Sequence, residues 1–404
     1  MDTSSKKNKK IISLVSMAHF YSHFFFFIFP PLFPLLKSDL EVSYIELGGI
    51  IVLFNLISAL TQLPMGILVD RLDAPRLLTF AVLCQAVSLV LISIFPSYLM
   101  IMIMMIPCGI ANAIYHPADY TILNRSVSSN VMGRAFSIHT VLGFSGSAVA
   151  PLTMVYLSSN YGWEDSLMII GTGGIVITLI LYLNISSLLN PNEENKDSIV
   201  NDKPLSIYST LRLLLTLPIL MGFMFWFFNS VAHTGISYFS VSAFTQIYEM
   251  ALSHANLCLT MFLSFTSLGI LLGGFLSDKT GKNIFIAIGG NLISGIAIIS
   301  LSMSNLNLLQ ILCIISLAGF MSGVTAPSRD LLVRNVAPKE SIGAVFGFVS
   351  TGLNVGGIFA PFIYGWFLDY KSALFVFIIS GICQILIITS VVGMMYSSQK
   401  NINT

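Results

Sequence analysis

One stretch of the sequence occurs in two related versions, as GILVDR at residues 66–71 and as GFLSDK at residues 274–279. Each copy closes a long apolar segment and ends with an aspartate followed by a basic residue. The copies lie 208 residues apart in a chain of 404 residues, so each belongs to a unit of about half the chain. We therefore expect an internal duplication.

More matches lie further along each half, at a constant offset of 210 residues. The stretch HPADYTIL at 116–123 corresponds to APSRDLLV at 326–333. The other matching positions are Gly133 and Gly343, Phe136 and Phe346, Gly146 and Gly356, and Ala150-Pro151 and Ala360-Pro361. Each repeat holds six apolar segments, and because six is an even number both copies are expected to have the same orientation.

The composition indicates an integral membrane protein. Hydrophobic residues make up 55% of the chain and charged residues 9%, whereas soluble domains carry about 25% charged residues. A spanning helix needs about 20 predominantly apolar residues, and twelve such stretches occur. They cover roughly residues 11–36, 44–69, 77–95, 98–123, 134–157, 166–188, 213–245, 251–276, 284–303, 307–332, 341–367 and 372–396.

The basic residues predict the orientation of these spans. If both termini are cytoplasmic, sixteen of the 19 lysines and arginines face the cytoplasm, and Lys37 and Lys371 face the other side. That distribution satisfies the positive-inside rule. We therefore expect a multi-pass protein of the inner membrane, monomeric, with an N-terminal bundle at 1–189, a cytoplasmic linker at 190–212 and a C-terminal bundle at 213–404.

The two copies of the opening motif also carry a family resemblance. GILVDRLDAPR (66–76) and GGFLSDKTGKN (273–283) resemble the loop signature of the major facilitator superfamily, G-x-L-[small]-D-[RK]-x-G-[RK]. The resemblance covers essentially the whole chain. It implies an all-α membrane protein with twelve transmembrane helices in two pseudo-symmetric six-helix bundles. The weaker features YHPAD, GRAF and Ala150-Pro151 look like those of bacterial fosmidomycin-resistance-type exporters and related uncharacterised transporters.

The signature loops have a role in the family, where they latch the outward-facing state. The residues that the resemblance assigns to this latch are Gly66, Asp70, Arg71, Gly274, Asp278, Lys279, Gly281 and Lys282. The first copy departs from the pattern, since Asp73 replaces the expected glycine and Pro75 follows. The alternative interpretation is that Asp70 and Asp278 are solvated helix caps.

Family members line a central cavity with spans 1, 4, 7 and 10, and each of these spans has polar residues at helical spacing. The candidate cavity residues are His19 and His23 in span 1, Asn112, His116 and Asp119 in span 4, Trp226 and His233 in span 7, and Thr325 and Arg329 in span 10. His139 and His254, outside these four spans, are expected to be structural or interfacial.

Asp119, Arg329 and Asp330 are the charged residues well inside spans. The offset of 210 makes Asp119 and Arg329 equivalent in the repeat, and we expect them to attract each other when the cytoplasmic side closes. Asp119 has two other possible roles. It can carry a proton shared with His116 or His23, or it can pack against Tyr120 and the backbone freed by Pro117.

Arg329 has two possible roles of its own. Its guanidinium can hold a carboxylate or phosphonate of the substrate through a bidentate pair. Alternatively, the neighbouring Asp330 neutralises it, and the two act as a structural pair near the cytoplasmic interface. The sequence leaves both interpretations open.

Several function classes are disfavoured. The five cysteines have no metal-binding spacing, and we expect no cofactor, no metal and, at a net charge of +1, no nucleic-acid partner. No GxxxxGK[ST] loop for a primary pump and no catalytic constellation for an enzyme occurs. The leading interpretation is a proton-coupled secondary transporter that works by alternating access on a small organic solute, with an anion favoured by Arg329. A drug or antibiotic:H⁺ antiporter is the alternative, followed by a non-transporting sensor.

Overall fold

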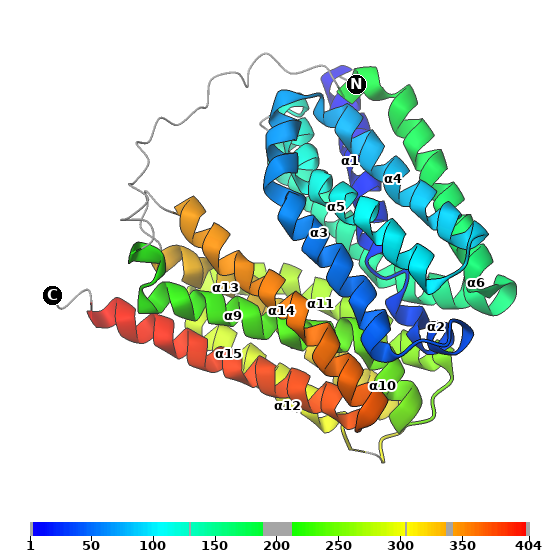
Figure 1. The fold of residues 1–404 in the computed structure, drawn as a ribbon. Coiled ribbons are helices and arrows are strands. Elements are labelled where there is room, and N and C mark those ends of the chain that lie inside the picture. The colour runs from blue at the N-terminus through cyan, green and yellow to red at the C-terminus, as the bar shows by residue number, and fades with distance from the viewer. Residues whose placement is uncertain (1–2, 129–130, 189–211, 304, 337–341, 401–404) are drawn as a thin grey trace. The chain divides into compact units, whose positions relative to one another are not determined.

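The computed structural model describes residues 3–128, 131–188, 212–303, 305–336 and 342–400, and this part of the chain is almost entirely helical (Figure 1). The first half contains α1 (Thr3–Phe25), the 3₁₀ turn η1 (Pro30–Leu32), α2 (Phe33–Asp39), α3 (Tyr44–Arg71), α4 (Ala74–Ile94), α5 (Tyr98–Ser126), α6 (Met132–Leu183) and α7 (Ile185–Leu188). The second half contains α9 (Leu217–Thr234), the π-helical turn η4 (Gly235–Phe239), α10 (Ser240–Ile247), α11 (Leu252–Thr280), α12 (Asn283–Ser300), α13 (Leu308–Val336), α14 (Ile342–Tyr370) and α15 (Leu374–Lys400).

Helix α6 contains two of the predicted spans. At 52 residues it would be about 78 Å long at 1.5 Å per residue, more than twice the ~30 Å of a bilayer core. Gly162, with φ 85° and ψ 162°, interrupts it between the predicted spans 134–157 and 166–188. The described chain has 11 helices long and apolar enough to cross a membrane, with Ile138–Leu183 counted once. The break at Gly162 therefore gives the twelve spans, and the predicted all-α membrane fold is confirmed.

The first span of each half is less regular than predicted. The expected span 11–36 is interrupted, because α1 ends at Phe25 and the chain resumes in η1 and α2. Pro30 and Pro31 have no backbone N–H to donate, so an α-helix through them would lack two successive hydrogen bonds. The expected span 213–245, which is the first span of the second repeat, contains the π-helical turn η4. Irregular backbone at membrane depth is tolerated where protein surrounds it, and Ile28 and Ile236 are fully buried.

The helices form two compact units. The first holds α1, α2, α4–α7 and α3 from Gly49 onward, and the second holds the start of α3 (Ser43–Gly48) and α9–α15. Repeat-related glycines bring helices together in both units. A Cβ at Gly146 would overlap the backbone of Phe20 on α1, and one at Gly356 would lie 2.9 Å from the carbonyl oxygen of Phe227 on α9. Small residues are a common means of close helix packing in membranes.

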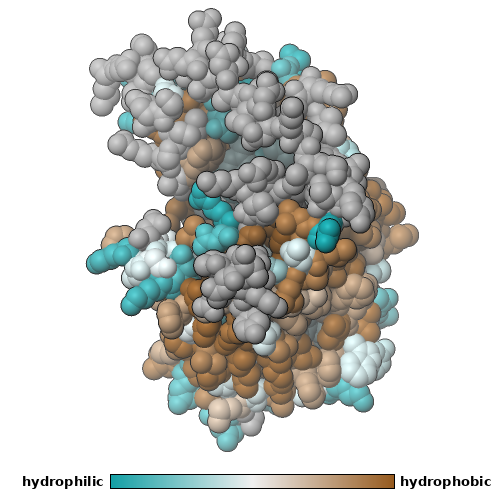
Figure 2. Space-filling view, turned by 90° about the vertical axis from the view of Figure 1, so that its left-hand side faces the viewer, coloured by the Kyte–Doolittle hydropathy of each residue, from teal (hydrophilic) through white to brown (hydrophobic). Residues whose placement is uncertain are grey.

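The surface of the protein matches a lipid environment. Figure 2 shows a broad hydrophobic band on one face, with hydrophilic residues at its edges. Many large apolar side chains are exposed, among them Leu271, Phe275 and Phe285, which are 57%, 65% and 74% accessible. Such a surface is unfavourable in water, whereas lipid chains are as apolar as these side chains.

The two signature loops close in different ways. In the second copy, α11 ends at Thr280 and is capped by Gly281, whose φ of 63° lies in the left-handed region. In the first copy, Asp73 precedes α4 with a φ of −72°, and its carboxylate lies 2.9 Å from Arg76. The first loop therefore needs no left-handed residue at this position, which explains how it accommodates an aspartate in place of the glycine.

Candidate functional site

The strongest cluster of ionisable side chains lies in the first unit, where α1, α5 and α6 meet. Helix α1 supplies His19 and His23, which are four residues apart and so share one face. Helix α5 supplies Asp119, and α6 supplies His139. Asp119 lies on α5 two residues after Pro117, which is accommodated inside the helix. The three helices thus direct polar groups from distant parts of the sequence toward one point.

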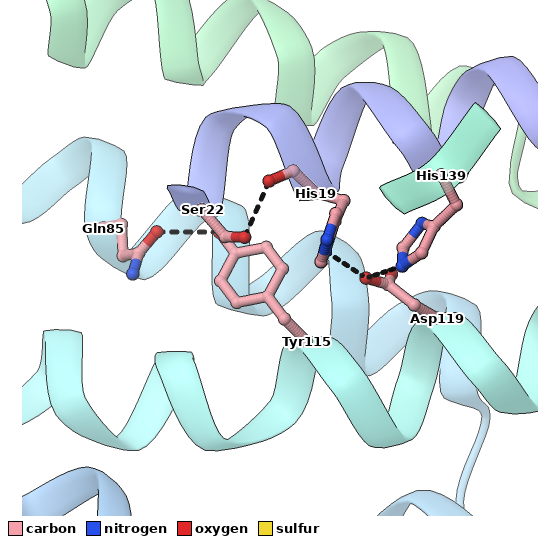
Figure 3. A network of polar contacts seen from close by, with 6 residues as sticks. All are labelled: His19, Ser22, Gln85, Tyr115, Asp119 and His139. Atoms are coloured by element: carbon pink, nitrogen blue, oxygen red, sulfur yellow. Dashed lines mark hydrogen bonds and ion pairs between the residues drawn. The ribbon is translucent and has the colours of Figure 1, made fainter. Parts of the chain in front are cut away.

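Asp119 is in direct contact with two histidines (Figure 3). Its Oδ2 lies 3.2 Å from Nδ1 of His19 and 3.7 Å from Nε2 of His139. All three residues are buried, with accessibilities of 0% for Asp119, 4% for His19 and 1% for His139. In the described part of the chain no lysine or arginine forms an ion pair with Asp119. The carboxylate therefore depends on the imidazoles for any compensation of its charge.

Two more histidines extend the cluster away from Asp119. The rings of His19 and His139 are stacked with centroids 3.8 Å apart. His23 and His116 lie 4.4 Å and 5.3 Å from His19 by the same measure. His116 is exposed, and Nδ1 of His23 lies 3.3 Å from the hydroxyl of Ser147. The cluster thus continues from a buried carboxylate to an exposed imidazole.

The position of His19 depends on a glycine. A Cβ at Gly143 on α6 would overlap the ring of His19 and would lie 3.3 Å from Cδ2 of His23. Residues 139, 143 and 147 recur every four positions and therefore form one stripe on α6, facing α1. This stripe supplies an imidazole, an open space for the ring of His19, and a hydroxyl.

Polar contacts on α4 and α3 hold α5 in place beside the cluster. Tyr115, one turn before Asp119, donates its hydroxyl to Oε1 of Gln85 on α4 at 2.8 Å (Figure 3). Asn112, predicted to line the cavity, donates to the hydroxyl of Ser58 on α3 at 2.8 Å. Both contacts lie between helices of the first unit, so these residues fix the rotation of α5 about its axis.

The second unit has a cationic site of its own. The guanidinium carbon of Arg329 on α13 lies 3.6 Å from the ring centroid of Trp226 on α9. Nε and Nη2 of Arg329 lie 2.8 Å and 3.4 Å from the carboxylate of Asp330. The Arg329 side chain is 15% accessible and that of Asp330 is 50% accessible. These contacts do not use Nη1 of Arg329, and the buried indole N–H of Trp226 has no hydrogen-bond partner in the described chain.

The remaining predicted cavity residues of the second unit have local partners. The hydroxyl of Ser237 lies 3.1 Å from Nδ1 of His233, one turn away on the same span. Thr325 is 3% accessible and donates its hydroxyl to the carbonyl oxygen of Ser322 at 2.7 Å. A Cβ at Gly290 on α12 would overlap the methyl group of Thr325, so Thr325 packs against α12.

The predicted latch residues are only partly described. The side chains of Asp70, Arg71 and Asp278 lie outside what the structure describes. Lys279 is exposed, with its ammonium group 5.7 Å from the ring centroid of Phe275, and Lys282 is exposed as well. Gly66 and Gly274 have no close neighbour at the Cβ position, the nearest being Pro327 at 4.0 Å from Gly274. The latch role therefore stays a prediction.

The main difference from the sequence-based site concerns His139. We expected it to be structural or interfacial, but it contacts Asp119 and stacks on His19. In the sequence, His139, Gly143 and Ser147 are visibly spaced four residues apart. That spacing indicates a role for His139 only when it is known which face of α6 meets α1. With two imidazoles and one carboxylate, the cluster can share a proton, and the same donor set can bind a metal ion.

Comparison with known proteins adds an independent line of evidence. The family model of the Major Facilitator Superfamily matches residues 15–253 and 227–400. The fosmidomycin resistance protein of Escherichia coli K12 is 24% identical over 368 residues, covering 89% of this chain and 88% of that protein. An uncharacterized MFS-type transporter of Methanocaldococcus jannaschii is 23% identical over 359 residues, covering 88% and 91%. The crystal structure of the nucleoside transporter NupG has a TM-score of 0.74 at 13% identity, covering 95% of this chain and 99% of that chain.

Proposed function

Because the chain belongs to the Major Facilitator Superfamily, we propose that this membrane transporter is a proton-coupled secondary transporter of a small organic anion. Solute and proton would cross the inner membrane by alternating access, with both chain termini in the cytoplasm. The family match confirms the resemblance seen in the signature loops, and the repeat of six spans supports a mechanism in which two halves move.

The observation that carries the proton coupling is the environment of Asp119. An isolated carboxylate in a low-dielectric interior is very costly, and ionisable residues inside membrane spans usually serve a function. Here two imidazoles contact the carboxylate, and one proton can reside on any of the three groups. His116, exposed and near His19, provides a path between this site and water.

The observation that favours an anionic solute is the pair of donors on Arg329 and Trp226. The indole ring covers one face of the guanidinium, and cation–π contacts of this kind stabilise by about 0.5–2 kcal/mol. The ring thereby fixes the orientation of the guanidinium while Asp330 occupies its Nε edge. Nη1, which neither contact to Asp330 uses, would bind a carboxylate or phosphonate, and a small movement of the Trp226 ring would bring its buried N–H to the same ligand. In this role Asp330 tunes the strength of the site by partly neutralising Arg329.

Export of a drug or antibiotic is the second candidate function. The observation that favours it is the similarity to the fosmidomycin resistance protein, which extends over 89% of the chain. Both candidates use the same proton site and differ in the sign of coupling. A symporter accumulates its solute when protons flow in the same direction, whereas an antiporter does so when protons flow in the opposite direction.

The test uses the full-length protein in proteoliposomes. A panel of small carboxylates and phosphonates, each paired with its neutral amide or ester, is first screened for ligands that raise the melting temperature. We expect stabilisation by the charged member of a pair only. Uptake of that ligand is then measured with the interior made acidic or alkaline, and the sign of the gradient that drives accumulation separates symport from antiport.

Asp119→Asn is the decisive variant. The amide cannot release a proton, so gradient-driven accumulation should fall at least tenfold, while exchange of labelled for unlabelled ligand at equal pH should persist. The matched control is Asp165→Asn, which makes the same change at an exposed position on α6. An Asp119→Asn protein that accumulates ligand as well as the wild type would refute the proposed role of Asp119.

A further inference from the structure

We propose that His19, Asp119 and His139 form a binding site for one divalent transition-metal ion of the zinc, cobalt and nickel class. The inference concerns the first unit alone and does not depend on which solute is carried. One potential ligand atom from each residue lies within 4.8 Å of the others. All three residues are more than nine-tenths buried, and they come from α1, α5 and α6, so the ion would join three helices.

The separations between the ligand atoms suit a tetrahedral ion. Zinc–nitrogen and zinc–oxygen bonds are about 2.0–2.1 Å long, which places two ligand atoms of a tetrahedron ~3.3–3.4 Å apart. Oδ2 of Asp119 lies 3.2 Å from Nδ1 of His19 and 3.7 Å from Nε2 of His139. Two of the three separations are therefore close to the tetrahedral value and the third lies within 4.8 Å, so an ion would require the stacked rings of His19 and His139 to turn toward it.

A second observation is independent of these distances. Five buried atoms of the cluster have no hydrogen-bond partner in the described chain: Nδ1 of His19, Oδ1 and Oδ2 of Asp119, and Nδ1 and Nε2 of His139. The 3.2 Å contact of His19 lacks the direction of an N–H···O bond, and the 3.7 Å contact of His139 is too long for one. A buried polar group without a hydrogen-bond partner is destabilising, so five such atoms within three neighbouring residues require an explanation. A metal ion at the centre would bind to imidazole and carboxylate lone pairs that no hydrogen bond uses.

The donor set determines the class of ion. Two imidazole nitrogens and one carboxylate oxygen suit zinc, cobalt, nickel and ferrous iron, whereas calcium and magnesium prefer oxygen ligands throughout. A divalent charge would also compensate Asp119, which no lysine or arginine of the described chain contacts. The fourth coordination position remains for water or for another imidazole that moves inward. His23 and His116 are the nearest candidates, with ring centroids 4.4 Å and 5.3 Å from that of His19.

Cobalt is the most direct probe. The full chain is purified through a tag without histidines, treated with EDTA, and titrated with Co²⁺, because cobalt with four or five ligands absorbs visible light far more strongly than the hexa-aqua ion. We expect one strongly absorbing Co²⁺ per chain, displaced by a single equivalent of Zn²⁺. Absence of such a species in monodisperse wild-type protein would overturn the proposal.

Variants locate the ion. Asp119→Asn and His139→Gln should weaken Co²⁺ binding at least tenfold, and His139→Cys should restore it because a thiolate is also a good ligand. His233→Gln and His254→Gln, which change histidines of the second unit, are controls that should bind as the wild type does. Equal loss in the His233→Gln control, or unchanged binding in monodisperse His139→Gln, would refute the assignment. Metal binding is measured without transport. A negative result would therefore overturn the metal site and leave the proposed proton coupling to be tested separately.

Discussion

At the scale of single residues, Asp119 sets the chemistry of the first unit. Burial is free of electrostatic cost for an apolar side chain, but a carboxylate needs a proton, a hydrogen bond or a cation. The two imidazoles beside Asp119 are the side chains best suited to exchange a proton near neutral pH. This is why both proposals made for the cluster, proton transfer and metal binding, involve the same three residues.

A glycine offers a test of how tightly this cluster is built. Gly143→Ala would place a methyl group against the ring of His19, which cannot move away freely because the ring of His139 is stacked on it. Overpacking of this kind costs about 1–3 kcal/mol, so the melting temperature should fall and gradient-driven uptake should fall with it. Both are measured on the purified protein and in proteoliposomes.

The matched control lies on the same helix. Gly173 has nothing within 4 Å of a Cβ position, and alanine is favoured over glycine inside helices by about 0.5–1 kcal/mol. Gly173→Ala should therefore be as stable as the wild type or slightly more stable. If Gly143→Ala matched Gly173→Ala in both stability and uptake, the space beside His19 would not be needed.

At the scale of elements, the breaks matter as much as the helices. In span 1, α1 ends at Phe25 and α2 begins after two prolines, whereas span 7, the first span of the second repeat, contains a π-helical turn. π-helical turns are frequent at functional sites. The same two spans carry His19 and Trp226, so each unit has its irregular backbone on the helix that bears a candidate site residue.

The end of α11 gives a prediction of a different kind. Gly281 adopts a φ of 63°, and a Cβ added there would have no neighbour within 4 Å, so only the backbone conformation disfavours other residues at this position. A left-handed conformation costs a residue with a Cβ about 1–2 kcal/mol. Gly281→Ala should lower the melting temperature in detergent accordingly, and Gly281→Asn should lower it less. Gly289→Ala, in the open interior of α12, serves as the comparison and should be as stable as the wild type or slightly more stable. An equal fall in melting temperature in both alanine variants would argue against backbone strain.

At the scale of the whole molecule, the break at Gly162 determines the topology. If α6 crosses the membrane twice, Asp165 lies outside and Leu188 lies inside. Alkaline phosphatase needs disulfides that form outside the cytoplasm, so a fusion after Asp165 should be active and a fusion after Leu188 inactive. A fluorescent protein fused to the C-terminus should fluoresce. An inactive fusion after Asp165 would mean that α6 crosses only once.

The fold was largely predictable from the sequence, and the candidate site only partly. Apolar segments of about 20 residues and a six-span repeat have few alternative arrangements, and the twelve-span fold is confirmed. His19, His116 and Asp119 were found because they recur at helical spacing on spans 1 and 4. His139 was not, because spacing within one helix does not tell which of its faces meets another helix.

The interruption of span 1 was missed for a related reason. By hydropathy alone, FFFFIFPPLF (24–33) is a continuous apolar run, since the prolines are flanked by phenylalanine and leucine. Their missing N–H groups were the available indication, but membrane helices often contain proline: α5 includes Pro107 and Pro117 without a break. Whether proline breaks or is accommodated depends on neighbouring helices, which a single sequence does not reveal.

The confinement of the His–Asp cluster to one unit has an evolutionary consequence. The positions that the 210-residue offset relates to Asp119 and His139 are Arg329 and Val349. At these positions the second copy therefore has a guanidinium in place of the acid and an apolar side chain in place of the imidazole. If both proposals hold, the duplication was followed by divergence in which one copy kept a site for protons or metal ions and the other acquired a site for anions.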